Sequence, residues 1–175
     1  MKRSLVLTLI LLTILPLHLL SVPPGEYQVK AALIFNFLRF VELNKERIKD
    51  NNINLCSFEE NKVNEEVKKL HGAVISGLTI RYQQIVKDGE IENCSVLIVN
   101  SRNENALKNL LEMAYQKKIL TISDINGYGE KGVVINMYLS DNKVRFEINT
   151  DAAEKSGVKI SSRLLTLAKI IKNIK

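Results

Sequence analysis

The residues that could support catalysis are few in this 175-residue chain, and they are widely spaced. Three carboxylates, Asp124, Glu147 and Asp151, are the candidates for paired acid–base chemistry, but their spacing gives no two of them a shared face. No nucleophile or histidine accompanies them. His71 stands beside Gly72 where a helix is expected to end, and it is interpreted as a capping or surface residue. The chain is therefore expected not to be an enzyme.

A glycine-rich segment, NGYGEKG at residues 126–132, superficially resembles a phosphate-binding loop. Such a loop follows a strand and opens a helix, because the helix N-terminus must face the anion. Here the pattern that follows, over residues 133–139, is that of a strand. The glycines are interpreted as turn residues, and no cofactor is expected.

The two cysteines, Cys56 and Cys94, are the remaining pair with chemistry of their own. In an oxidising compartment an even pair predicts one disulfide. Closing a loop of roughly 38 residues would restrict the unfolded chain by about 4 kcal/mol on the loop-entropy account. Two free buried thiols are the alternative. A metal site is not expected, because structural zinc needs four ligands and His71 is the only histidine beyond residue 20.

The N-terminal segment indicates the compartment. Lys2 and Arg3 precede an uncharged run, Ser4 to Leu20, that consists mostly of Leu, Ile and Val. This layout predicts a secretory signal over residues 1–21, and hence an exported, periplasmic protein. Pro16 favours a signal over a membrane-spanning helix. No A-x-A motif marks a cleavage site, so an uncleaved anchor that tethers the protein to the inner membrane stays open.

The charge of the chain is basic but does not predict a nucleic-acid partner. Without Lys2 and Arg3, 23 basic residues remain against 19 acidic ones, a net charge near +4. An exported chain rarely meets nucleic acid, and no aromatic residues are interleaved with the charges. The excess is interpreted as a solvated basic helix face near the C-terminus, made of Lys155, Lys159, Arg163, Lys169, Lys172 and Lys175.

The elements that must position these residues follow from hydrophobic periodicity. About 150 residues follow the signal, enough for one domain. The sequence predicts an α/β fold, a mixed β-sheet flanked by helices, in a single domain over residues 26–172. Helices are expected over residues 26–43, 61–70 and 105–116, and strands over 53–58, 78–82, 95–99 and 119–122. Residues 133–139 and 143–149 are expected to form a hairpin with its turn at 140–142. Helices from Asp151 and from Ser162 should close the chain, the last with Leu164, Leu167, Ala168 and Ile171 facing the core.

The second strand of this hairpin alternates. Val144, Phe146 and Ile148 point one way, so Arg145 and Glu147 share the opposite face. An exposed cross-strand salt bridge is one interpretation of that face, and contact with a partner is the other.

Several ordered blocks of the sequence resemble the YfiR-like family of exported bacterial proteins. The similarity covers residues 26–171 and rests on YQVKAA from Tyr27, Asn36-Phe37, Phe40-Val41-Glu42, Cys94 and the strand after it, LTISD from Leu120, Gly132, RFEIN from Arg145, and ISSRLL with Leu167-Ala168. The resemblance implies a periplasmic α/β domain that represses a membrane-bound diguanylate cyclase, or another membrane receptor, within cyclic-di-GMP control of biofilm formation. It also implies a homodimer.

The resemblance further assigns roles to particular residues. Cys56 and Cys94 match one cysteine pair of the family, whereas a second pair, expected near Gly129 and Asn136, is missing. The region associated with partner contact aligns with Glu147 and the helix that follows, which gives the candidate contact residues Arg145, Glu147, Ala153 and Lys159. The alternative function is a periplasmic small-molecule-binding module whose ligand occupies an apolar groove beside the first helix.

Overall fold

The computed structural model describes residues 25–58, 60–101 and 103–172, so the signal predicted over residues 1–21 lies outside the described residues. The α-helices are α1 (Glu26–Arg39), α2 (Lys62–Lys68), α3 (Glu104–Gln116), α4 (Thr150–Lys155) and α5 (Ser162–Leu165), and the 3-10 helices are η1 (Lys45–Arg47) and η2 (Asp88–Asn93). The strands are β1 (Val41–Glu42), β2 (Asn52–Ser57), β3 (Val74–Ile75), β4 (Leu78–Gln84), β5 (Val96–Ile98), β6 (Leu120–Ser123), β7 (Ile135–Ser140), β8 (Lys143–Asn149), β9 (Lys159–Ile160) and β10 (Lys169–Ile171).

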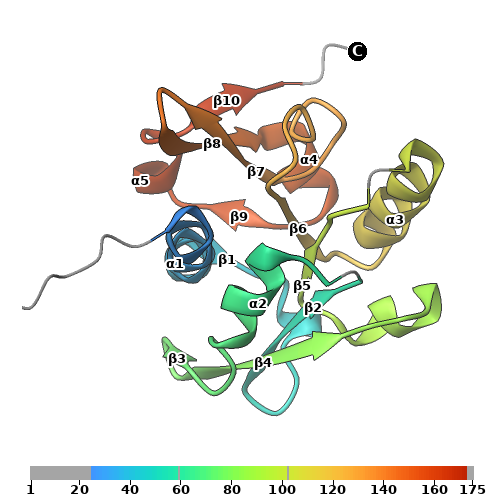
Figure 1. Cartoon of the computed structure of the whole chain (residues 1–175). Coiled ribbons are helices and arrows are strands. Elements are labelled where there is room, and N and C mark those ends of the chain that lie inside the picture. Colours follow the sequence, from blue (N-terminus) through green and yellow to red (C-terminus); the bar gives the residue numbers. More distant parts are fainter. Residues whose placement is uncertain (1–24, 59, 102, 173–175) are drawn as a thin grey trace, which may run out of the picture.

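One mixed sheet organises the molecule (Figure 1). Its strands lie in the order β10-β8-β7-β6-β5-β2-β4-β3, and the five central strands from β7 to β4 run parallel. The hairpin strand β8 pairs antiparallel with β7, and β10 pairs parallel with β8. A separate two-stranded sheet joins β1 to β9. The predicted α/β class with a mixed sheet is confirmed.

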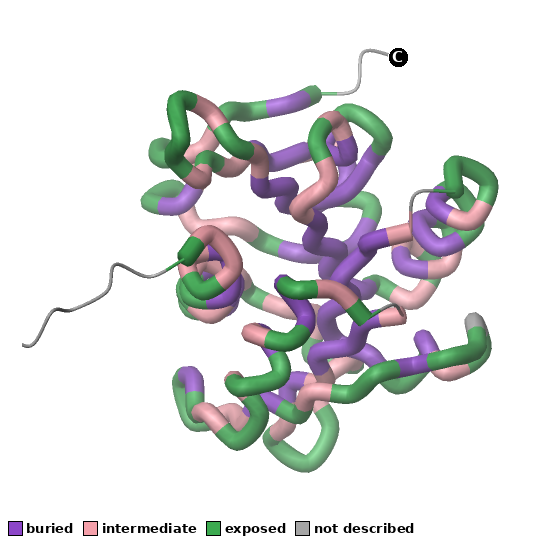
Figure 2. The backbone as a smooth tube through the Cα atoms, in the orientation of Figure 1, coloured by how far each residue is buried: buried purple, intermediate pink, exposed green. Residues whose placement is uncertain are grey.

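Both faces of the central sheet are buried, and each face has its own core. In β5, Val96 and Ile98 pack with residues of α1 and α2, whereas Leu97 packs with α3 and the disulfide on the other face. Successive side chains of a strand point to opposite faces, so a continuous apolar run such as β5 requires cover on both sides. The tube in Figure 2 accordingly shows the buried segments running through the middle of the sheet.

The first helix ends earlier than its composition predicts. We expected a helix to residue 43, but α1 ends at Arg39 and the chain turns into β1. Val41 and Glu42 pair antiparallel with Ile160 and Lys159, and the Phe40 carbonyl accepts a hydrogen bond from the Ser161 N–H at 2.9 Å. Pairing with a distant strand therefore overrides local helix propensity here.

The C-terminal helix predicted from Ser162 is wrong beyond its first turn. The helix α5 ends at Leu165, and Lys169–Ile171 form β10 on the open edge of β8. Leu167, which we expected in the core, is 70% exposed. The two adjacent β-branched residues Ile170 and Ile171 suit a strand, and a strand edge is available to pair with them. The basic residues from 155 to 172 are solvated as predicted, but they are distributed over α4, β9, α5, β10 and the residue after it rather than along one helix face.

The predicted hairpin and disulfide are both confirmed. The hairpin turn contains only Asp141 and Asn142, both with positive φ, as a two-residue type I′ turn requires. Cys56 and Cys94 form a disulfide with an S–S distance of 2.02 Å, so they are not free thiols. The bond ties β2 to the residue that follows η2 and lies within the core beneath α3.

Candidate functional site

A large cavity lies at the carboxyl ends of three neighbouring parallel strands. Residues 61–63 follow β2, residues 100, 101 and 103 follow β5, and residues 124–126 follow β6; together with Tyr27 of α1 they line a crevice of about 820 Å³. The chain leaves β2 through α2 on one face of the sheet and leaves β5 through α3 on the other. Loops that leave adjacent strands in opposite directions open such a crevice, which is where open parallel sheets bind ligands.

An ion cluster holds one wall of the crevice. The Lys30 ammonium, on a residue only 5% exposed, lies 2.6 Å from Glu26 Oε1 and donates a hydrogen bond of 2.9 Å to Asp124 Oδ2. Burial disfavours the charge on Lys30, but the hydrogen bonds and the attraction of the two carboxylates outweigh burial and raise the pKa of the ammonium. The cluster therefore fixes the start of α1 against the end of β6.

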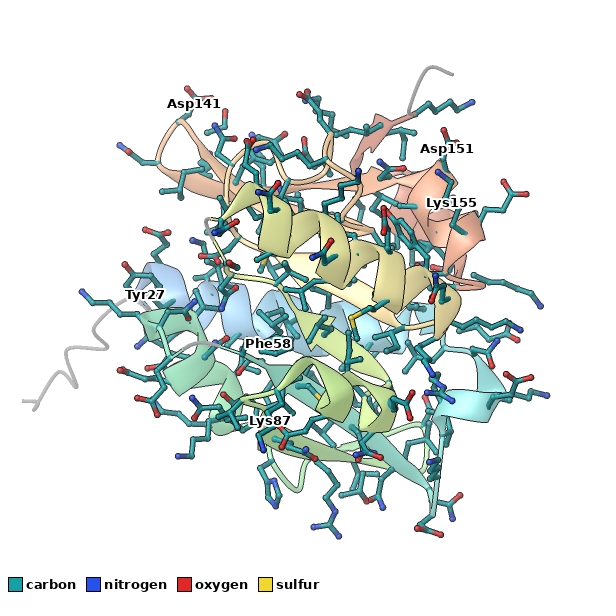
Figure 3. The ribbon with its side chains drawn as sticks, turned by 90° about the vertical axis from the view of Figure 1, so that its right-hand side faces the viewer. Tyr27, Phe58, Lys87, Asp141, Asp151 and Lys155 are labelled. Carbon is teal, nitrogen blue, oxygen red and sulfur yellow. A yellow bond between two sulfur atoms is a disulfide. The ribbon has the colours of Figure 1, made fainter. Side chains whose placement is uncertain are left out.

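Two tyrosines restrain the surroundings of the crevice: Tyr27 lines it, and Tyr128 holds a lining loop from the neighbouring core. The Tyr27 ring lies near two ammonium groups, with Lys30 Nζ 5.7 Å and Lys62 Nζ 5.6 Å from its centroid. Figure 3 shows Tyr27 at the start of α1, beside α2. On the opposite side the Tyr128 hydroxyl donates a 2.6 Å hydrogen bond to the Ser101 carbonyl, which ties the glycine-rich loop to the loop after β5. Both contacts limit how far the crevice can open or collapse.

Four of the ten lining residues are asparagines, and one of them is unusual. Asn61 and Asn103 cap α2 and α3, because their side-chain oxygens accept hydrogen bonds from backbone N–H groups of the first helical turns. Asn100 is only 7% exposed, yet among the described residues neither its Oδ1 nor its Nδ2 has a hydrogen-bond partner. Buried amides are normally paired, so an unpaired one at a crevice points to a missing partner.

The glycine-rich loop does not bind phosphate by the mechanism its sequence suggests, since turns and β7 rather than a helix follow it. Its glycines serve the turn chemistry that we predicted: Gly127 and Gly132 have φ of 81° and 109°. Gly129 is needed for a different reason. A Cβ at this position would lie 2.5 Å from Glu147 Oε1, so the loop can pack on Glu147 only through glycine.

Glu147 is buried, which corrects our interpretation of its strand face as exposed. The residue is 4% exposed, and its carboxylate accepts a hydrogen bond of 3.0 Å from Asn136 Nδ2 and lies 3.3 Å from Lys169 Nζ. The strand alternation was right, but it could not reveal the loop and β10 that cover this face. The predicted cross-strand salt bridge exists, with Lys169 of β10 as the partner.

The four residues predicted to contact a partner do not form one surface patch. Arg145 and Lys159 are exposed, whereas Glu147 and Ala153 are buried, with exposed fractions of 4% and 5%. Ala153 and Lys159 line the same shallow pocket, of about 380 Å³, between α4, β9 and α5; Arg145 and Glu147 do not. Partner contact at these residues stays a prediction.

Two of the carboxylates considered for acid–base chemistry bind different partners. Asp124 binds Lys30, and Glu147 binds Asn136 and Lys169. His71 Nδ1 accepts a hydrogen bond from the Tyr82 N–H at 3.3 Å, in keeping with a surface role. Within the described ranges, no group of three or more His, Cys, Asp or Glu residues could hold a metal ion.

Sequence reasoning missed the crevice itself. Its lining comes from four separate segments, and only the strand order brings them together. One sequence signal could have predicted the crevice: polar residues, many of them asparagines, directly follow three of the predicted strands. A parallel sheet would place those residues along one edge.

The fold and the crevice define an α/β protein with an open, mainly parallel sheet and a cavity at its carboxyl edge. The chain belongs to the YfiR/HmsC-like family, whose model matches residues 27–169. The recognition made from the sequence blocks is therefore confirmed. A search of the curated proteins finds no significant match.

Two solved structures share the fold. A conserved domain protein from Vibrio cholerae O1 biovar El Tor superposes with a TM-score of 0.56 at 15% identity over 85% of this chain. The ABC domain in complex with L-Trp from Streptococcus pneumoniae superposes with a TM-score of 0.51 at 12% identity over 83% of this chain. This chain spans 60% of the length of each, so the similarity establishes the fold alone.

The family supports a regulatory rather than catalytic protein that works outside the cytoplasm. The disulfide is compatible with export. Over the part of the chain that the structure describes, no helix combines the length and the apolar character needed to cross a membrane.

Proposed function

We propose that the protein is a non-enzymatic periplasmic regulator that binds and represses a membrane-bound signalling protein, a diguanylate cyclase of the cyclic-di-GMP pathway. Membership of the YfiR/HmsC-like family is the observation that carries this proposal. To hold a two-state receptor almost wholly inactive, the regulator must bind the inactive state about 5.5 kcal/mol more tightly than the active one. Such a difference calls for an extended protein surface rather than a single contact.

The surface around β9 is the best-supported place for this contact. The pocket that contains Ala153 and Lys159 adjoins a second pocket of about 420 Å³ beside β1, and the two share Lys159 and Ile160. The Lys159 side chain is 80% exposed and lies 3.5 Å from Glu42, in an ion pair that solvent screens. Lys159 is thus free to exchange Glu42 for a carboxylate of a partner.

Co-purification from solubilised membranes tests the proposal. The tagged protein should recover a membrane-bound cyclase. Lys159→Glu should weaken recovery about tenfold or more, because it places a second carboxylate opposite the carboxylate that Lys159 would bind on the partner. Lys108→Glu, a charge reversal at an exposed lysine of α3, is the matched control and should leave recovery unchanged. Repeated recovery of no cyclase or other receptor would contradict the proposed function. If the unmodified protein and both variants recovered the receptor equally well, the β9 surface would be refuted as the contact, but the proposed function would stand.

Localisation and assembly complete the proposal. We infer a periplasmic protein, either released by cleavage after residue 21 or tethered to the inner membrane by an uncleaved signal. N-terminal sequencing of the exported protein separates these two forms. A homodimer is part of the proposal, and sedimentation of the purified protein at micromolar concentration measures it.

A second candidate function is binding of a small molecule, and the crevice at the carboxyl edge of the sheet favours it. The ABC domain from Streptococcus pneumoniae, which shares this fold, is described in complex with L-Trp. The crevice lies at the N-terminal end of α1, whereas we anticipated an apolar groove beside that helix, and its walls are polar and apolar in about equal measure. Shifts in melting temperature across a metabolite collection test this candidate.

A further inference from the structure

We propose that the crevice binds a small molecule of no net charge that presents a hydrogen-bond donor and an acceptor side by side, as a carboxamide or a nucleobase edge does, and that Asn100 selects it. The inference rests on the second candidate function and is independent of the repression of a membrane protein. It names the ligand chemistry and the residue that determines specificity.

Asn100 carries the argument for the donor–acceptor edge. Its side-chain amide offers two N–H donors and an acceptor oxygen, and none of these is used within the described residues. Because the residue is only 7% exposed, bulk water does not satisfy the amide either. A buried amide gains most from a partner that matches both of its atoms, and the complementary partner is another planar donor–acceptor pair.

The charges around the crevice argue for a ligand without net charge. The cluster of Glu26, Lys30 and Asp124 has one more negative than positive charge, and the Lys62 ammonium nearby offsets it. The four described charges therefore cancel. An ion that entered a partly buried and already balanced site would leave a charge without compensation, which costs more than a neutral hydrogen bond gains.

The size of the crevice and the Tyr27 ring argue for a small planar group. A volume of about 820 Å³ lies within the range of small-molecule sites. The ring is held near two ammonium groups, so its orientation is restricted before a ligand arrives. A carboxamide or a nucleobase can pack a flat face against such a ring while its edge meets an amide.

Calorimetric titration of the purified, disulfide-bonded protein with two matched pairs of probes tests the ligand chemistry. L-Glutamine is compared with L-glutamate, which has the same shape but carries a net charge and lacks the amide donor. Adenosine is compared with purine riboside, which lacks only the exocyclic amino donor. We expect at least one of L-glutamine and adenosine to bind, and its counterpart to bind roughly tenfold more weakly or worse. The two pairs also distinguish a carboxamide ligand from a nucleoside.

Variants of Asn100 test the residue. Asn100→Ala and Asn100→Asp should each weaken binding of the preferred probe roughly tenfold or more, because each removes the donor. Asn36→Ala, which alters an exposed asparagine on α1 that does not line the crevice, should bind as the unmodified protein does. In the absence of ligand, Asn100→Ala should melt no lower than the unmodified protein, since it removes an amide that has no partner. A merely structural asparagine would lower the melting temperature.

Three results would overturn the inference: no binding of any of the four probes, preference for L-glutamate or purine riboside over its counterpart, or binding that the Asn100 variants leave intact. Binding that survives in the Asn100 variants would refute the role of Asn100 but keep the small-molecule function. A metabolite collection that causes no melting shift at all would refute that function as well.

Discussion

Glu147 and Gly129 lie in close contact where the glycine-rich loop packs on the sheet. The loop approaches so closely that a methyl group at residue 129 would meet the Glu147 carboxylate. Asn149 adds a hydrogen bond of 2.8 Å from its Nδ2 to the Gly129 carbonyl. This hydrogen bond and the close packing on Glu147 hold the glycine-rich loop on the sheet.

Replacement of Gly129 by alanine should therefore destabilise the protein by about 1–3 kcal/mol, because the added methyl group must displace a buried, hydrogen-bonded carboxylate. Urea denaturation measures the loss. Gly89→Ala is the matched control, since nothing lies within 4 Å of a Cβ there and its φ is not left-handed. Equal stability of the two variants would mean that the loop gives way at little cost.

The ammonium of Lys30 should contribute to stability in a defined pH range. Its pKa is raised in the folded protein, so its contribution is complete below the pKa of an unfolded lysine, about 10.4, and is lost as pH rises through the folded value. Lys30→Met should lower the free energy of unfolding by on the order of 2 kcal/mol at pH 8, since it leaves two carboxylates without their donor.

The measurement is denaturation of both proteins from pH 8 to pH 11.5. Their difference should be constant at first and shrink at the alkaline end. The matched control is Lys68→Met, which replaces an exposed lysine of α2 that makes no ion pair with a described residue, and it should show little difference at any pH. A Lys30→Met difference that persists undiminished at pH 11.5 would mean that the side-chain stem, rather than the charge, stabilises the fold.

At the scale of elements, strands buried on both faces were predictable and edge strands were not. The segments that form β5 and β6 are apolar because a core covers each of their faces. A strand covered on both faces is recognisable in the sequence as a continuous apolar run. The short strands β1 and β10 show no such apolar run, because each forms only by pairing with a strand that is distant in the sequence. Local propensity in both segments favoured a helix, and tertiary pairing decided otherwise.

The disulfide is the covalent link between elements that should matter most for stability. It joins β2 to Cys94, the residue that follows η2, across a separation of 38 residues. Reduction should lower the stability by about 4 kcal/mol, which corresponds to a melting temperature lower by roughly 8–16 °C. Differential scanning calorimetry with and without a phosphine reductant measures this. The double variant Cys56→Ala/Cys94→Ala should show no response to the reductant, and an unchanged melting temperature in protein whose thiols titrate as reduced would contradict the expectation.

At the scale of the whole molecule, the family blocks identified the fold but not the crevice. Blocks such as YQVKAA in α1 and LTISD at β6 contain core residues. The similarity of these blocks to the family therefore indicates a shared packing of the core. Lys30 and Asp124 also belong to these blocks, yet only the folded chain reveals that they bind each other across 94 positions. Asn100 lies in neither block, and nothing in its neighbours distinguishes it from a solvent-exposed loop residue.

The pairing of β1 with β9 also bears on how the chain matures after export. The helix α1 is the first described element. The centroid of its Phe37 ring lies 4.9 Å from that of Phe146 in β8, and the next strand, β1, pairs with β9. A chain that crosses a membrane N-terminus first could pack α1 against α2 early, but it would leave Phe37 without Phe146 and β1 without β9 until those residues have arrived. Contacts of such long sequence separation form slowly. Arrival of β8 and β9, rather than of α1, would therefore determine when the fold is completed.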